Sequence, residues 1–182
     1  MLTLIRNTTI AGTTDGVRRD ILIAGEKIES IHEPGAATLS GLELETFDAS
    51  GLTVLPGFID SHVHLTGGGG EGGPATRAPE ILIENIVSSG VTTVIGCLGT
   101  DGVTRHQSSL MAKARGLEQE GITAYVYVGS YEIPVQTLTG SVRSDLALLP
   151  SVLGAGEIAI SDHRSSQPTF DELARLASLG VI

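Results

Sequence analysis

Residues 55–71 read Leu-Pro-Gly-Phe-Ile-Asp-Ser-His-Val-His-Leu-Thr-Gly-Gly-Gly-Gly-Glu and decide how the rest of the chain is interpreted. A short apolar run leads into His62-Val63-His64, as expected for a strand that ends at the two histidines. Side chains two residues apart on a strand point to the same face, so His62 and His64 would direct both imidazoles to one point. Two imidazoles are good ligands for a divalent metal such as zinc. The simpler alternative is a pair of exposed histidines at a strand end.

The chain shows two different patterns on either side of this stretch. Before it, short segments of alternating apolar and polar residues, with a hairpin turn at Gly25-Glu26, predict a small all-β module. After residue 56, strand-like segments alternate with helical ones, the pattern of a parallel α/β sheet. The predicted strands cover 58–63, 91–98, 122–128 and 156–160, with a further strand beginning at 181. The predicted helices run from 78 until Gly90 stops the first, then over 108–119, 144–153 and 169–179.

Four strand–helix units make half of an eightfold (β/α) barrel, which needs about 250 residues. The chain has 182 residues. We therefore expect it to be the N-terminal part of a longer protein, or one half of a broken one.

The composition excludes several classes of function. A formal net charge of −10 argues against binding to a phosphate backbone, so no nucleic acid partner is expected. Cys97 is the only cysteine, which excludes an intrachain disulfide and a cysteine-held zinc; a buried apolar role is expected for it. The first residues do not form a signal peptide, and no run approaches the roughly 18 apolar residues of a membrane span. These features predict a soluble, cytoplasmic protein with no membrane partner.

Several sequence motifs resemble a known family. Pro56-Gly57-Phe58-Ile59-Asp60, followed by the two histidines, resembles the metal-binding signature of the amidohydrolase superfamily. The Gly67–Glu71 run is similar to that of the isoaspartyl (beta-aspartyl) dipeptidases, as are 98–101, 129–134 and 160–165. The resemblance implies that 1–55 are strands of a small β-sandwich. It implies that 56–182 form the first half of a metal-dependent TIM (β/α)8 barrel, the remainder of which lies outside this chain.

The resemblance also assigns roles to residues that follow the predicted strands, where barrel sites lie. Gly69, Gly70 and Glu71 would face the free α-amino group of the substrate, and Thr100 would contact the substrate. Tyr131 would polarise the scissile carbonyl or hold the oxyanion by hydrogen bonding. Arg164 would bind a substrate carboxylate, since a guanidinium grips a carboxylate at two points. Asp162 and His163, which are metal-ligand types by composition, would be structural, and for Asp101 a turn or cap role is preferred.

Glu157 departs from the family pattern. The family's usual residue here is a lysine carboxylated by carbon dioxide, whose carbamate bridges two metals. Glutamate offers the same charge and two oxygens with a shorter reach, and the neighbouring Gly154-Ala155-Gly156 could let the backbone come closer. We therefore expect His62, His64 and Glu157 to hold metal, with Glu157 bridging two zinc ions. A single metal, or a lost site, are the alternatives.

The function implied is hydrolysis of the β-aspartyl peptide bond of a small dipeptide by a metallo-dipeptidase, a homo-oligomer when complete. The family's other metal ligands, two histidines and an aspartate that shuttles protons, are not among these residues. The chain alone is therefore expected to be inactive. The alternatives are another amidohydrolase, such as a hydantoinase-like cyclic amidase or an N-acyl amino acid deacylase, or an inactive, truncated scaffold protein.

Overall fold

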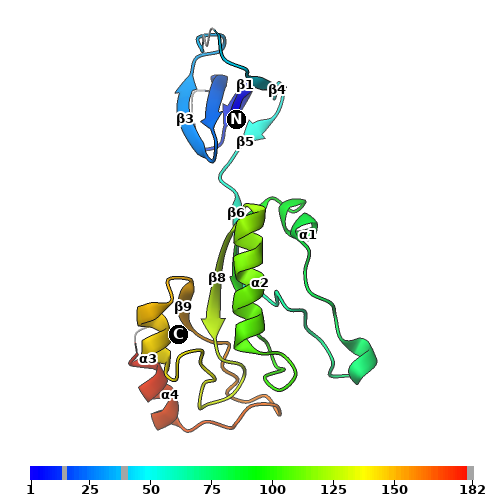
Figure 1. Cartoon of the computed structure of the whole chain (residues 1–182), viewed down its shortest axis with the longest axis vertical. Helices are drawn as coiled ribbons and strands as arrows, with labels where there is room; N and C mark the ends of the chain where they lie inside the picture. The colour runs from blue at the N-terminus through cyan, green and yellow to red at the C-terminus, as the bar shows by residue number, and fades with distance from the viewer. Residues whose placement is uncertain (14–15, 38–40, 180–182) are drawn as a thin grey trace. The chain divides into compact units, whose positions relative to one another are not determined.

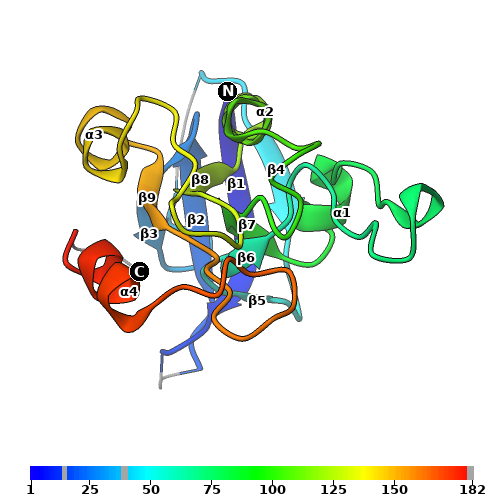
Figure 2. The ribbon, with the colours of Figure 1, turned by 90° about the horizontal axis from the view of Figure 1, so that it is seen from below.

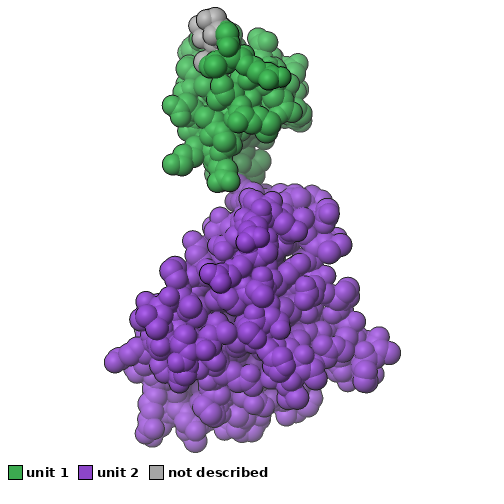
Figure 3. All heavy atoms as spheres, in the orientation of Figure 1, with its two compact units in different colours: residues 1–56 green, residues 57–182 purple. Residues whose placement is uncertain are grey.

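The computed structural model describes residues 1–13, 16–37 and 41–179, so the strand predicted at 181 and the glycine expected to close the last helix lie outside the described residues. The chain divides into two compact units, Met1–Pro56 and Gly57–Ile182, which are coloured separately in Figure 3. Within the described residues, no helix has both the length and the apolar character that crossing a membrane requires.

The first unit is a β-sheet module. Its strands are β1 (Leu2–Ile10), β2 (Arg19–Ala24), β3 (Lys27–His32), β4 (Glu45–Asp48) and β5 (Thr53–Val54). The sheet order is β3-β2-β1-β4, and β5 pairs with β1. The predicted hairpin is confirmed, because β2 and β3 pair antiparallel on either side of Gly25-Glu26. Strand β4 begins at Glu45, where its parallel pairing with Thr3 of β1 starts.

The second unit contains a parallel sheet in the order β6-β7-β8-β9, so each strand neighbours the next along the chain. The strands are β6 (Phe58–Val63), β7 (Val91–Gly96), β8 (Thr123–Val128) and β9 (Val152–Ala155). The connections contain η1 (Pro74–Thr76), α1 (Ile83–Val87), α2 (Gln107–Glu120) and α3 (Val142–Leu148), and α4 (Phe170–Ala177) follows β9 (Figure 1). Helices α1, α2 and α3 lie around the outside of the strands (Figure 2). The alternation of strands and helices predicted from the sequence is confirmed.

The core of this unit lies between the sheet and α2. Leu110, Ala114 and Leu117 are fully buried on α2, and they repeat at the spacing of one helix face. They belong to the same buried cluster as Val94 of β7 and Val126 of β8. This packing fixes the carboxyl ends of the strands, where the polar side chains of interest follow.

The first predicted helix was placed too early. Residues 78–82 are not helical, and α1 begins only after Leu82. Proline disfavours the helical conformation in the residue before it, here Ala78. The backbone amides of Ala78 and Ile81 instead donate to the carbonyls of Gly68 and Leu65, at 2.9 and 3.2 Å. The segment is therefore held in extended form against residues 65–68, at the start of the glycine-rich loop (residues 66–78).

The strand predicted over 156–160 and the end of the helix predicted over 144–153 were also wrong. Helix α3 ends at Leu148 because Pro150 cannot continue it. The apolar residues that follow form β9, which pairs with Val126–Val128 of β8. Strand β8 ends at Val128, so residues 157–160 have no strand beside them in this pairing. Glu157 therefore follows the end of a strand instead of lying within one.

Helix α4 begins with a capping box, which gives a stability prediction. The Thr169 hydroxyl accepts a hydrogen bond from the Glu172 amide at 3.3 Å, and Glu172 Oε2 accepts one from the Thr169 amide at 2.8 Å. Thr169→Ala should lower the free energy of unfolding by about 1 kcal/mol, measured by urea denaturation. Thr169→Ser keeps the hydroxyl and should leave it nearly unchanged. Equal losses in the two variants would contradict a capping role.

Candidate functional site

The two histidines lie at the carboxyl end of β6. His62 is on the strand and His64 follows its last residue, Val63. The centroids of the two imidazole rings are 5.4 Å apart, whereas Val63 packs against the buried core. The strand alternation inferred from the sequence thus places both imidazoles together and the intervening valine elsewhere.

Glu157 meets both imidazoles with one oxygen. Its Oε2 forms a close contact with Nε2 of His62 and lies 3.4 Å from Nε2 of His64. Potential ligand atoms of the three residues all lie within 4.8 Å of one another. The peptide bond between Gly156 and Glu157 is cis. The structure brings together the three residues predicted to hold metal, from the carboxyl end of β6 and from the segment that follows β9.

The donor set fits a divalent metal. Two imidazole nitrogens and a carboxylate are ligands that zinc and related ions accept. The three donors come from residues 62–64 and from residue 157, which are far apart along the chain, and they meet at one place. The side chain of Glu157 is partly shielded, at 21% exposed. The chemistry and proximity of the three groups suit a metal centre better than they suit three independent surface groups.

The backbone of Gly99 packs closely against the His64 imidazole. Its φ angle is +78°, and a Cβ atom there would lie 3.0 Å from Cε1 and 3.1 Å from Nε2 of His64. Gly99→Ala should therefore displace the imidazole and lower Zn²⁺ affinity by about 10-fold, the lower end of the range seen when groups that orient a ligand are changed. Competition with a chromophoric chelator measures this. Gly116→Ala on α2, where nothing lies within 4 Å, is the matched control; equal affinities in the two variants would refute the prediction.

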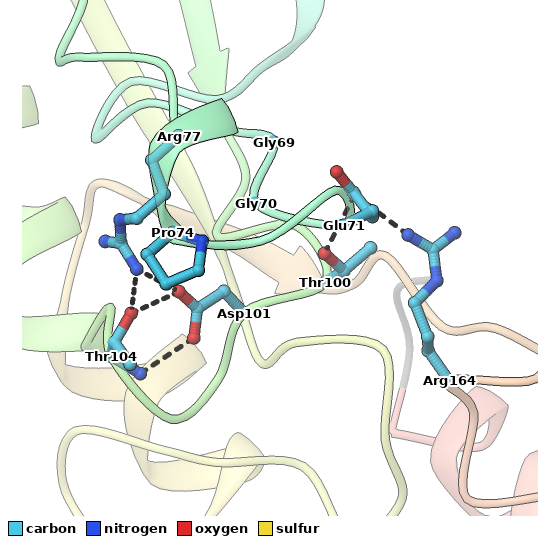
Figure 4. Close-up of a pocket in the computed structure, with 9 residues that line it drawn as sticks. All are labelled: Gly69, Gly70, Glu71, Pro74, Arg77, Thr100, Asp101, Thr104 and Arg164. Atoms are coloured by element: carbon cyan, nitrogen blue, oxygen red, sulfur yellow. Dashed lines mark hydrogen bonds and ion pairs between the residues drawn. The ribbon is translucent and has the colours of Figure 1, made fainter.

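A separate hollow of about 500 Å³ is lined by five of the six residues predicted to contact the substrate: Gly69, Gly70, Glu71, Thr100 and Arg164 (Figure 4). Tyr131 is not among the residues that line it. Nη1 of Arg164 lies 2.8 Å from Oε1 of Glu71, and the Thr100 hydroxyl lies 3.5 Å from the same oxygen. The hydrogen bond from its own backbone amide, together with the charge of Arg164, lowers the pKa of Glu71. Glu71 is therefore an anion able to face a cation.

Arg164 is held on its other side by Asp162. Nε and Nη2 of the guanidinium donate to the two oxygens of that carboxylate, both at 2.8 Å. These hydrogen bonds lower the pKa of Asp162 strongly. His163 is exposed, and its Nδ1 lies 3.5 Å from Oδ1 of Asp162. Asp162 thus orients the arginine, in agreement with the structural role that the resemblance implies for it.

Tyr131 lies between the two groups of residues. The Arg164 guanidinium carbon is 5.3 Å from the centroid of the Tyr131 ring. Burial first, and then the charge of Glu157 and a hydrogen bond to it, raise the pKa of the Tyr131 phenol. The phenol therefore stays protonated near neutral pH and can donate a hydrogen bond.

Sequence reasoning missed Arg105, whose side chain is only 5% exposed. It donates to the carbonyls of Thr66 and Gly68, which lie far from it along the chain. A lone arginine before a helix gives no signal of such contacts. Asp101 accepts hydrogen bonds from the amides of Val103 and Thr104, as its predicted turn role requires, but it also contacts Arg77 and Arg105. Cys97 is buried as predicted, and burial raises the pKa of its thiol to about 12.

Known proteins are similar to this chain in sequence and in fold. The sequence profile described as the amidohydrolase family matches residues 45–121. The crystal structure of beta-aspartyl dipeptidase from Fervidobacterium islandicum superposes with a TM-score of 0.90 and 47% sequence identity, over 98% of this chain and 48% of that one. The chain resembles the N-terminal half of a beta-aspartyl dipeptidase of the amidohydrolase superfamily. This likeness confirms the family resemblance and the predicted α/β fold class.

Other relatives are more distant. A dihydroorotase from Solibacter usitatus is 32% identical over 87% of this chain and 34% of its own length. An adenine deaminase from Halalkalibacterium halodurans is 29% identical over 76% of this chain and 23% of its own length. The fold also matches dihydropyrimidinase from Brevibacillus agri, with a TM-score of 0.57 and 24% identity over the whole chain and 39% of that structure. The chain therefore spans about half of the solved dipeptidase chain and about a third or less of these curated relatives.

Proposed function

We propose that this chain contributes to a metal-dependent hydrolase that cleaves the β-aspartyl peptide bond of dipeptides. The observation that carries the proposal is the pairing of Glu71 with Arg164 in one hollow, joined through Tyr131 to the cluster of His62, His64 and Glu157. An acid and a guanidinium side by side suit a substrate that carries both an ammonium and a carboxylate group. The similar dipeptidase from Fervidobacterium islandicum has been solved in complex with the β-Asp-Leu dipeptide, which supports this substrate class.

Each residue of the hollow has a proposed role. Glu71 accepts hydrogen bonds from the substrate's α-ammonium group, and the backbone of Gly69 and Gly70 permits its close approach. Thr100 contacts the substrate beside Glu71. Arg164 binds a substrate carboxylate with a charge-assisted hydrogen bond, and Tyr131 donates to the oxygen of the scissile carbonyl as negative charge develops there.

The proposed cofactor is zinc, as two ions bridged by Glu157. His62, His64 and Oε2 of Glu157 would hold one ion, because both imidazoles face that oxygen. A bound divalent metal polarises carbonyl oxygens and lowers the pKa of water toward neutrality, which is the chemistry that amide hydrolysis needs.

Several statements about the whole protein are carried as proposals from the family resemblance. The remaining metal ligands and the proton-shuttling aspartate would come from outside these residues. Residues 1–55 would belong to a β-sandwich, and 56–182 to the first half of the barrel. A cytoplasmic location and a homo-oligomeric assembly are proposed on the same ground.

A substrate panel tests the proposed activity. The full-length protein, loaded with Zn²⁺, should release leucine from β-Asp-Leu and not from α-Asp-Leu or N-acetyl-leucine, and it should not open the ring of hydantoin. Glu71→Gln should raise KM for β-Asp-Leu while the bound metal content stays the same. Hydrolysis of hydantoin or of dihydroorotate in preference to β-Asp-Leu would assign the chain to a cyclic amidase instead. No hydrolysis of any compound by metal-loaded protein would favour a scaffold role.

A further inference from the structure

A network of charged residues to which no substrate contact has been assigned supports the glycine-rich loop that carries Glu71. We propose that Asp101, acting through Arg77 and Arg105, is a positioning residue that fixes where Glu71 stands relative to Thr100. The inference rests on the proposed function only in naming the substrate's ammonium group as what Glu71 meets. Figure 4 shows the two parts, with Arg77, Asp101 and Thr104 on one side of the hollow and Glu71, Thr100 and Arg164 on the other.

Arg105 holds the base of the loop from within the protein. Its Nε donates to the carbonyl of Thr66 at 3.2 Å, and its Nη2 donates to the carbonyls of Gly68 and Ala78 at 2.9 and 3.4 Å. These carbonyls belong to the two ends of the loop, so one buried cation closes it. A buried guanidinium also needs a counter-charge, and Oδ2 of Asp101 provides one at 3.3 Å from Nη1.

Arg77 connects the same carboxylate to the far side of the loop. Its Nη1 lies 3.0 Å from Oδ2 of Asp101 and contacts the Thr104 hydroxyl. Residue 77 also pairs with Gly69 through an isolated β-bridge. Asp101 thus contacts two arginines, one buried at the base of the loop and one bridged to the backbone two residues before Glu71.

Asp101 is fixed as an anion. Partial burial acts to raise its pKa, but hydrogen bonds from Thr104 and Val103 and the charge of Arg77 outweigh burial and lower the pKa to about 2. Its other oxygen accepts from the amides of Val103 and Thr104 at 3.1 and 2.7 Å. The carboxylate is therefore anchored to the loop after β7, which also carries Thr100.

The loop has little room to adjust without these contacts. Gly69 has φ +69°, and a Cβ atom there would lie 2.6 Å from the carbonyl oxygen of Thr76. The segment around Gly69 and the segment around Thr76 are thus in direct backbone contact. Moving the 76–78 side would move the glycines, and with them Glu71. Asp101 touches neither Glu71 nor the metal cluster in the described residues, so its influence passes through the backbone.

The isosteric variant Asp101→Asn tests the proposal. An asparagine oxygen can still accept from the two amides, but it removes the charge shared by the arginines. The readout is the ratio of kcat/KM for β-Asp-Leu to that for N-succinyl-leucine, which lacks only the α-amino group. The ratio should fall about 10-fold, mainly through KM for β-Asp-Leu, because Glu71 no longer meets the ammonium correctly. Asp171→Asn, the same change on exposed α4, should leave the ratio unchanged.

An unchanged ratio would overturn the positioning role, whether kcat/KM stays the same for both substrates or falls equally for both. A second readout is independent of the proposed function: hydrogen exchange of the loop amides of Gly67, Gly73 and Ala78, which are hydrogen-bonded across the loop and its turns. Asp101→Asn should speed their exchange about 10-fold, and Asp171→Asn should not. If the wild-type protein hydrolyses neither compound, the proposed function fails, and unchanged exchange would then reject the network as well.

Discussion

Replacing Glu157 by alanine should lower the affinity for Zn²⁺ by more than about 100-fold. The variant loses the carboxylate that both imidazoles face, and changing groups that merely orient a ligand already costs 10- to 100-fold. His62 and His64 alone would remain as ligands from the described residues. Elemental analysis of dialysed full-length protein, together with a competition titration, measures both the number of bound ions and their affinity.

The outcome also decides between one ion and two. Two ions per wild-type site, both lost or weakened in Glu157→Ala, would support the bridging role. One ion per wild-type site, or unchanged occupancy in the variant, would contradict it. Glu132→Ala removes an exposed carboxylate next to Tyr131 along the chain and is the matched control; it should bind as the wild-type protein does.

Tyr131→Phe should lower kcat for β-Asp-Leu by about 10²–10³-fold and leave KM nearly unchanged. Removing one hydrogen-bond donor to a developing oxyanion has a cost of that size. The ring would remain, and with it the contact to the Arg164 guanidinium. Substrate binding should therefore survive while the chemical step slows, and steady-state kinetics of Tyr131→Phe and the wild-type protein would show this.

Tyr125→Phe is the control for Tyr131→Phe, because it removes a hydroxyl from β8 that does not line the substrate hollow. The kcat of this control should stay within about twofold of the wild-type value. If Tyr131→Phe instead raises KM with kcat unchanged, the phenol contributes to substrate binding and not to the transition state.

The sequence predicted those parts of the site that depend on local spacing. His62 and His64 are separated by one residue on a strand, so their convergence follows from strand geometry alone. Outside the site, the start of the helix predicted over 169–179 is also locally determined, because Thr169 caps α4 within its first turn. The position of β9 was missed, since an apolar run after Pro150 fits a strand and a helix equally well and only pairing with β8 decides between them.

The contacts that could not be predicted join residues far apart along the chain. Arg105 meets carbonyls of the glycine-rich loop only because β6 and β7 are neighbours in the sheet. Backbone carbonyls are present at every residue, so the sequence carries no mark of which ones a buried arginine will find. The pairing of Glu71 with Arg164 likewise required the loops after β6 and β9 to converge, although the family resemblance had assigned both residues to the substrate.

The carboxylate of Glu157 is encoded in the gene, so the proposed metal centre would need no modified residue for its assembly. A carbamate on lysine forms from dissolved carbon dioxide, so a centre built on it depends on bicarbonate supply. A glutamate that already faces His62 and His64 needs no such supply. Reconstitution of the metal-free protein with Zn²⁺ should reach the same extent in carbon-dioxide-purged and bicarbonate-supplemented buffer. A Glu157→Lys variant should make the same reconstitution dependent on bicarbonate.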